Sequence, residues 1–244
     1  MKIIKTIIFI LFFSLSSHLN AATKDCFEKV NRVTFAFNNK LDKAIIKPIA
    51  TGYSYLPNPV KSGINKATSN ILYLITIPND FLQGSFSNAI NNSGRFLVNS
   101  TLGILGIFDP AKKLGLKKIE HEDYGQTLGK WGFGPGCYFV LPLFGPTTVR
   151  DTIGQAGNIL LDPFYIMTVG NKEVLNSDFA ERVYYIEKGA DLINYRSQNL
   201  KNLENLEKNS VDYYSTIRSL YLQRRENLIS NNISDNDMDW KDLK

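Results

Sequence analysis

Apolar side chains recur at intervals of three and four residues along most of the chain, which is the spacing of an amphipathic α-helix. Residues 25–53 show this pattern first, and a proline-rich turn at 57–59 ends it. The next predicted helix runs from about Pro59 to Leu74. Pro78 is expected to stop it, because proline lacks the N–H that a helix interior uses and clashes with the preceding turn.

A third helix is expected over residues 78–100, with a break at 91–94, where the sequence Asn-Asn-Ser-Gly disfavours helix. Residues 101–150 are rich in glycine and proline and lack a clear period. We expect loops and short helices there, and one possible strand at residues 138–143.

The C-terminal part predicts helix again. One apolar stripe consists of Ile186, Ala190, Ile193, Leu200 and Leu203. Asn209 and Ser210 predict a break and the N-cap of a further helix. That helix would carry Val211, Tyr214, Ile217 and Tyr221 on one face. From residue 230 the chain is polar and acidic, which is typical of disorder. The pattern therefore predicts an all-α protein. The length after the signal peptide suits one large domain or two small ones, and we expect a single helical domain over residues 22–229 with a disordered tail over 230–244.

The first residues have the layout of a secretory signal peptide. Lys2 and Lys5 precede an apolar run at residues 7–15, which is too short to span a bilayer. We expect cleavage after Ala21, and the alternative is a retained N-terminal anchor. Cys26 follows Thr-Lys-Asp rather than a box of small residues, so we expect an exported protein that is not lipidated at this cysteine.

Charge is distributed unevenly along the chain. The net charge of +5 falls to +3 without the two lysines of the signal peptide, and no basic patch with interleaved aromatic residues predicts nucleic-acid binding. Residues 67–108 carry only Asp80 and Arg95 as charged side chains. This charge-poor block is either an ordinary buried core or a surface that meets lipid. Its apolar runs are too short to cross ~30 Å of hydrocarbon, which favours a helix lying in the interface.

The sequence holds little that predicts enzyme chemistry. His121 is the single histidine after the signal peptide, and it is expected in a solvated turn, because three consecutive residues at 121–123 do not readily face one metal ion. Gly132, Gly134 and Gly136 lack the Lys-Ser/Thr that follows a phosphate loop. We therefore expect no enzyme, no cofactor and no metal. A lipid hydrolase would require His121 or a carboxylate pair within a pocket.

Five segments carry a resemblance to a known family. They read NRVTFAFNNKLD at 31–42, PNDFLQG at 78–84, RFLVNSTLGILGIFDPA at 95–111, EDYGQTLG at 122–129 with GPTTVRD at 145–151, and DYYSTIRSLYLQRR at 212–225. In this order and at this spacing they resemble the MlaA/VacJ family over nearly the whole mature chain.

The resemblance implies a ring-like helical bundle embedded in or lying on the outer membrane of a Gram-negative bacterium, with a central amphipathic channel. It implies that phospholipid misplaced in the outer leaflet is removed without covalent chemistry, which maintains lipid asymmetry. The implied partners are phospholipid, a trimeric porin and the soluble periplasmic carrier MlaC. Members of the family are usually lipoproteins, and this sequence departs from that pattern, which leaves its means of membrane attachment open.

The family segments also supply candidates for the lining of the channel. They are Phe35, Phe37, Asn38, Asp42, Gln83, Arg95, Gly132 and Gly134. Arg95 has two interpretations, a phosphate ligand or a structural residue paired inside the protein.

Cys26 and Cys137 occupy positions that commonly hold proline in relatives. A disulfide would explain both replacements together, and an oxidising compartment would permit it. The alternative is two free thiols. A second functional class also stays open, namely a structural porin-associated envelope protein without a lipid channel.

Overall fold

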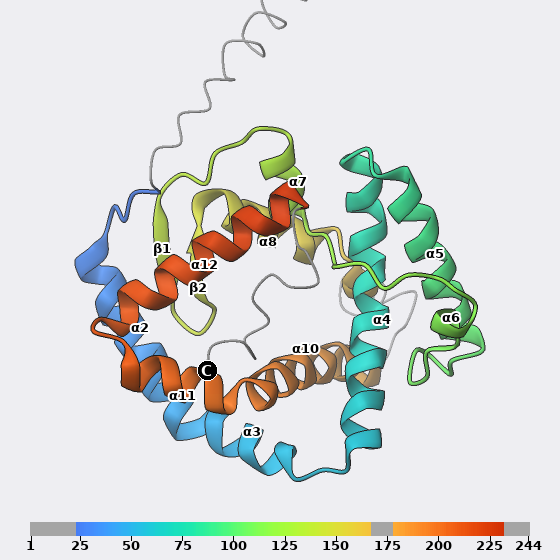
Figure 1. The fold of residues 1–244 in the computed structure, drawn as a ribbon, viewed down its shortest axis with the longest axis horizontal. Coiled ribbons are helices and arrows are strands. Elements are labelled where there is room, and N and C mark those ends of the chain that lie inside the picture. Colours follow the sequence, from blue (N-terminus) through green and yellow to red (C-terminus); the bar gives the residue numbers. More distant parts are fainter. Residues whose placement is uncertain (1–22, 167–177, 232–244) are drawn as a thin grey trace, which may run out of the picture.

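The computed structural model describes residues 23–166 and 178–231, and these are mostly helical (Figure 1). The helices are α2 (Glu28–Leu41), the π-helix η1 (Asp42–Ile46), α3 (Lys47–Ser54), α4 (Asn58–Leu82), α5 (Phe86–Thr101), α6 (Pro110–Lys113), α7 (Tyr124–Lys130), α8 (Val149–Leu160), α9 (Pro163–Tyr165), α10 (Asp178–Gln198), α11 (Leu200–Asn209) and α12 (Tyr213–Ser230). The predicted signal peptide and most of the predicted tail lie outside the described residues.

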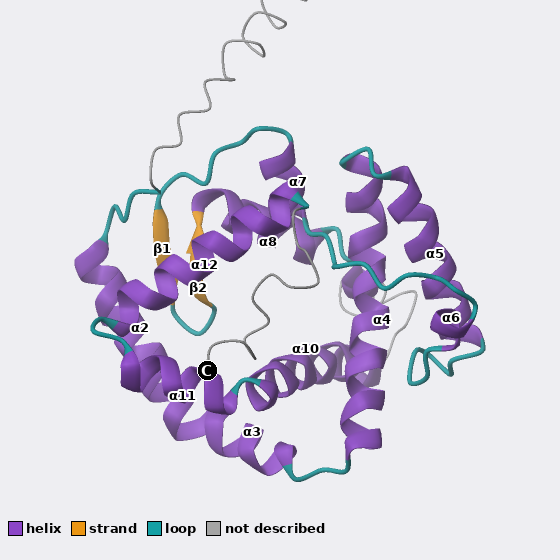
Figure 2. Ribbon diagram, in the orientation of Figure 1, coloured by secondary structure: helices purple, strands orange, loops and turns teal. Residues whose placement is uncertain are grey.

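The elements follow one another around a ring (Figure 1). Helices α2, α3 and α11 form one side, the antiparallel pair α4 and α5 forms the opposite side, and α10 runs between these two sides. Strands β1 (Tyr138–Leu141) and β2 (Gly145–Thr148) form an antiparallel hairpin next to α8 and α12 (Figure 2). The predicted all-α, ring-like fold is confirmed, and so is the short strand expected at 138–143.

Two predicted helix boundaries are wrong. Helix α4 continues through Pro78 to Leu82. The turn after the proline is held by tertiary hydrogen bonds, because the Thr127 hydroxyl donates to Asn79 (2.6 Å) and the Asn92 amide donates to Asp80 (2.8 Å). These bonds offset the cost of a proline inside a helix.

Helix α5 is likewise unbroken at residues 91–94. Asn92 is fully buried against α4, and Gly94 lets Leu116 approach closely, so packing overrides the local preference for a turn. The actual break lies at residues 83–85, where Gly84 adopts the left-handed φ of 77° that glycine tolerates best.

The predicted break near Asn209 and Ser210 is present, but the predicted N-cap is wrong. The cap of α12 is Asp212, whose carboxylate accepts a hydrogen bond from the Ser215 N–H. Both carboxylate oxygens of Asp212 also accept hydrogen bonds from Arg32 on α2 (3.1 and 2.7 Å). This distant partner, 180 residues earlier in the chain, favours aspartate as the cap.

The interior of the described protein is unusually polar. Buried side chains include nine hydrophobic residues but twenty-one polar or charged ones, while many large hydrophobic side chains are exposed. Two buried glycines show how closely the elements approach. A Cβ atom on Gly154 of α8 would lie 2.2 Å from the backbone nitrogen of Gly125 on α7, so only glycine permits this contact. Backbone packing and hydrogen bonds therefore form much of this core.

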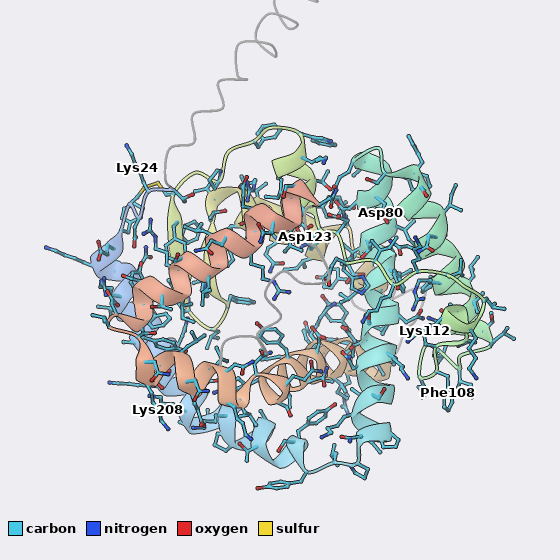
Figure 3. The ribbon with its side chains drawn as sticks, in the orientation of Figure 1. Lys24, Asp80, Phe108, Lys112, Asp123 and Lys208 are labelled. Carbon is cyan, nitrogen blue, oxygen red and sulfur yellow. A yellow bond between two sulfur atoms is a disulfide. The ribbon has the colours of Figure 1, made fainter. Side chains whose placement is uncertain are left out.

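A disulfide and a backbone hydrogen bond connect residues 24–26 to the start of β1. Cys26 and Cys137 form a disulfide with their Cα atoms 5.6 Å apart, visible beside Lys24 in Figure 3. The Tyr138 N–H donates to the Lys24 carbonyl (2.8 Å), and Asn31 donates to Asp25 (2.7 Å). The bridge closes a loop over a sequence separation of 111 residues.

We expect the double substitution Cys26→Ser with Cys137→Ser to lower the free energy of unfolding, because it removes a constraint on the unfolded chain. The chain-entropy model gives up to ~4.7 kcal/mol for a loop of this size. Urea unfolding of the oxidised wild type and the variant, followed by circular dichroism, measures the difference. Two titratable thiols in unfolded, unreduced wild-type protein would contradict the bridge.

Candidate functional site

A pocket of about 170 Å³ lies between the consecutive helices α2, η1 and α3 on one side and helices α10 and α11 on the other. The start of β2 and the start of α12 complete its lining. Three basic side chains (Lys43, Lys47, Arg196) and three acidic ones (Asp42, Glu204, Glu207) line it. The remaining lining residues are Phe35, Asn38, Asn39, Gly145, Pro146, Leu203 and Tyr213. The pocket therefore contains both signs of charge, while apolar atoms make up the larger part of its exposed lining. We call it the polar pocket after its six charged side chains.

Each basic side chain of the pocket is paired with an acidic one from another element. Arg196 on α10 donates two hydrogen bonds of 2.8 Å to the two carboxylate oxygens of Asp42 on η1. Lys47 lies 2.6 Å from Glu204, and the ammonium group of Lys47 lowers the pKa of that carboxyl. Lys43 likewise lies against Glu207 and lowers its pKa. The six groups therefore hold opposite charges side by side at neutral pH.

Phe35 and Asn38 position the neighbouring elements. The Phe35 ring packs edge-on against Tyr213, with centroids 5.4 Å apart. The Asn38 side chain donates to the Leu141 carbonyl and accepts from the Leu143 N–H, both at 2.9 Å. Leu143 has a φ of 70°, which is unfavourable for a branched residue, so these bonds support the turn of the hairpin.

The predicted channel residues do not gather in one place. Phe35, Asn38 and Asp42 line the pocket, whereas Phe37 on the same helix is half exposed and does not line it. Gly132 and Gly134 lie exposed in the loop after α7. Sequence spacing could not separate these groups, because it does not show which face of α2 meets its neighbours.

Arg95 and Gln83 are parts of a buried network around α4. Arg95 donates to the Tyr73 hydroxyl (2.8 Å), to the Leu116 carbonyl (2.7 Å) and to both carboxylate oxygens of Asp109 (2.9 Å each). Of its two interpretations, the structure therefore shows the paired structural residue. Gln83 donates to Glu122 (2.8 Å), whose pKa burial raises to about 7.

His121 is not in a solvated turn, so that prediction was wrong. Its Nε2 lies 2.8 Å from the Ser69 hydroxyl and its Nδ1 lies 2.8 Å from the Thr76 hydroxyl, while its ring packs on Tyr73. The Thr76 hydroxyl donates to the Leu72 carbonyl, so the network assigns the ring proton to Nδ1. Burial, with Lys118 and Arg95 nearby, lowers the pKa of His121 to about 4, which keeps it neutral.

The charge-poor block supplies an exposed surface as well as this network. We call it the outer apolar face, and its large exposed side chains are Phe86, Ile90, Leu97, Leu102, Leu105 and Phe108. Phe108 lies at the outer edge of the ring in Figure 3. Across the described residues, no helix combines the length and hydropathy needed to span a bilayer. The block is therefore not simply a buried core.

The sequence analysis did not predict a network of ion pairs in which one arginine joins three helices. Arg225 on α12 donates to both oxygens of Asp123 (2.7 and 3.0 Å) at the N-terminus of α7, and to Asp151 on α8 (2.9 Å). The Tyr221 hydroxyl also donates to Asp151 (2.6 Å). Burial by itself would raise the pKa of both carboxyls, but Arg225 holds them below their usual value. The residues lay in the family segments, but no local pattern showed that they meet.

We expect Arg225→Gln to destabilise the protein by about 3 kcal/mol, because it takes the ion-pair partner from the Asp123 carboxylate. Asp151 loses one of two guanidinium partners and keeps its contact with Arg150 (3.1 Å). Since the folded pKa values of Asp123 and Asp151 are lowered, the contribution is present above their unfolded pKa of ~4 and is lost as pH falls below it. Urea unfolding at pH 7 and pH 3 should show the largest difference from wild type at pH 7.

Arg224→Gln is the matched control, because the neighbouring Arg224 is exposed. An equal loss in both variants, or a difference that does not change with pH, would contradict the role assigned to Arg225.

Comparison with known proteins agrees with this geometry. A family model described as MlaA lipoprotein matches residues 23–228. An uncharacterized protein of Rickettsia bellii is 38% identical over 215 residues, which cover 86% of this chain and 80% of that protein. The intermembrane phospholipid transport system lipoprotein MlaA of Escherichia coli K12 is 32% identical over 214 residues, covering 83% and 77%.

A solved structure that concerns maintenance of bacterial outer membrane lipid asymmetry has the same fold. It matches with a TM-score of 0.71 at 31% identity, over 84% of this chain and 99% of that one. By sequence over nearly the whole described chain, and by its fold, this protein belongs to the MlaA lipoprotein family.

Proposed function

We propose that this protein removes phospholipid misplaced in the outer leaflet of the outer membrane and passes it to a soluble periplasmic carrier, without covalent chemistry. The observation that carries the proposal is the polarity of the ring, with polar side chains buried and large apolar side chains exposed. Relatives are named as parts of an intermembrane phospholipid transport system. The family's trimeric porin and MlaC carrier are the partners that we propose here.

The physical problem in lipid removal is the contrast between the two ends of the lipid. Each CH₂ group exposed to water costs about 0.8 kcal/mol, and a charged headgroup is costly to move through hydrocarbon. A ring that carries polar groups inside and rests in hydrocarbon outside lowers both costs. The polar pocket and the outer apolar face supply these two environments in one chain.

The outer apolar face also provides a means of membrane attachment for a chain without a lipidated Cys26. Each large side chain transferred from water to lipid contributes about 1.5–3 kcal/mol. Several such side chains together exceed the marginal binding of a single myristoyl chain, of K ≈ 10⁴ M⁻¹. We therefore propose that α5 and the loop after it rest in the membrane interface.

Within residues 23–166 and 178–231, the contact between Ser69 and His121 favours hydrolysis of lipid as a second function. Its geometry resembles a nucleophile beside its base. However, Ser69 lies inside α4, where helical hydrogen bonds occupy the backbone N–H groups that an oxyanion hole would use. His121 does not line the polar pocket either. These positions support transfer rather than hydrolysis.

We expect Ile90→Lys and Leu97→Lys to weaken membrane binding, because both side chains are mostly exposed on α5 (69% and 62%) and a charge within the bilayer costs up to about 3.5 kcal/mol. Flotation with phospholipid vesicles measures the bound fraction. Val211→Lys is the control, because Val211 is fully exposed in the turn before α12, and this variant should float like the wild type. Unchanged flotation of both α5 variants would rule out this face.

We expect His121→Ala to leave lipid removal intact, because transfer needs no base. In a strain that lacks the native protein, outer-leaflet phospholipid should stay as low with the variant as with the wild type. Ser69→Ala should behave in the same way. Loss of activity in both variants, at unchanged abundance and thermal midpoint, would instead support a hydrolase.

A further inference from the structure

The charges of the polar pocket sum to zero. Both walls carry both signs of charge: one wall, formed by η1 and α3, has one acidic and two basic side chains, and the other, formed by α10 and α11, has one basic and two acidic ones. Each charge pairs with an opposite charge on the other wall. A volume of about 170 Å³ is below the 300–1,000 Å³ of a typical small-molecule site. The pocket is thus small for a whole phospholipid, and it suits a group the size of a headgroup.

Arg196, which lines the pocket, carries a hydrogen-bond donor without a partner. Its side chain is 9% exposed and two of its nitrogens bind Asp42. Its buried Nη1 has no hydrogen-bond partner within the described part of the chain. A buried donor without an acceptor is costly, and guanidinium groups bind phosphate oxygens well. A phosphate that reaches Nη1 on binding would supply the missing acceptor.

The two lysine pairs can exchange partners at little cost. The side chains of Lys43 and Lys47 are 50% and 36% exposed, and their partners Glu207 and Glu204 are about one third exposed. Ion pairs at such exposure contribute little to stability. A ligand that carries both charges can therefore open one such pair and form an ion pair with each of its two side chains.

We propose that this pocket holds a zwitterionic phospholipid headgroup of the phosphoethanolamine type. The phosphate would lie against Arg196 and Lys47, and the ammonium group against Glu204 and Glu207. Phe35, Leu203 and Pro146 border the same pocket and would meet the apolar start of the lipid. This inference rests on the proposed transport of phospholipid, and it adds a preference for zwitterionic over anionic lipid.

The test measures which lipid the purified mature protein binds. The protein is incubated in mixed micelles with equal amounts of phosphatidylethanolamine and phosphatidylglycerol, and bound lipid is counted by native mass spectrometry. Glu204→Gln with Glu207→Gln gives the pocket a net charge of +2. Lys43→Gln with Lys47→Gln gives it −2.

The matched control is Lys112→Gln with Lys113→Gln. These lysines are exposed on α6, and Lys112 lies on the other side of the ring from α11 (Figure 3). The control removes two positive charges outside the pocket. Thermal unfolding checks that each variant is folded.

The wild type and the control should bind phosphatidylethanolamine in preference to phosphatidylglycerol. Loss of one hydrogen bond to a charged group corresponds to roughly tenfold in affinity. The +2 variant should therefore shift the ratio toward phosphatidylglycerol by about tenfold, and the −2 variant should weaken phosphatidylethanolamine binding to a similar degree.

Equal binding of the two lipids by the wild type would overturn the inferred headgroup preference, and this result does not depend on whether the variants fold. The same result would leave the proposed phospholipid transport intact. Failure to bind either lipid would count against the proposed function itself. A separate experiment tests binding of soluble phosphoethanolamine. If the protein binds this compound but not the lipid, the ligand of the pocket is a free phosphate ester, and the inferred headgroup site is overturned.

Discussion

Polar groups taken out of water must find partners, because a buried donor or acceptor without one costs about 1–3 kcal/mol. This constraint governs the whole ring, since its buried side chains are mostly polar. Arg225 meets it by joining Asp123 and Asp151, which links α12 to α7 and α8. Arg95 meets it on the opposite side through Tyr73 and Asp109. Each arginine binds partners from different elements, so the arrangement of the elements depends on these bonds.

A second consequence of a polar interior is that apolar side chains remain for the outside. The outer apolar face on α5 and the following loop is the clearest example, and it lies where the sequence is nearly free of charge. In water such a surface would favour association, whereas in a bilayer interface it is stabilising. The same distribution of polarity thus explains both the fold and the proposed position of the protein at the membrane.

The proposed transfer of lipid without covalent chemistry is compatible with the titratable groups of the ring. His121 is held neutral between two hydroxyl groups, and burial raises the pKa of Glu122 to about 7. In the polar pocket every carboxylate faces a cation from another element. In the binding mode that we propose, a headgroup exchanges one set of ion pairs for another, and no bond in the lipid has to break.

The sequence by itself determined the helical class, most of the helices, the strand at β1 and the family, because periodicity and turn residues are local properties of the chain. The tertiary structure decided what depends on distant partners. Asn79 and Asp80 hold α4 past Pro78 through residues on other elements, and His121 is buried by residues of α4 that lie 45 and 52 positions earlier in the chain. Likewise, α10 and α11 bring their charges to Asp42, Lys43 and Lys47 only when the ring closes. Such pairs have no periodic signature, because a hydrogen bond between distant segments leaves no local pattern in the sequence.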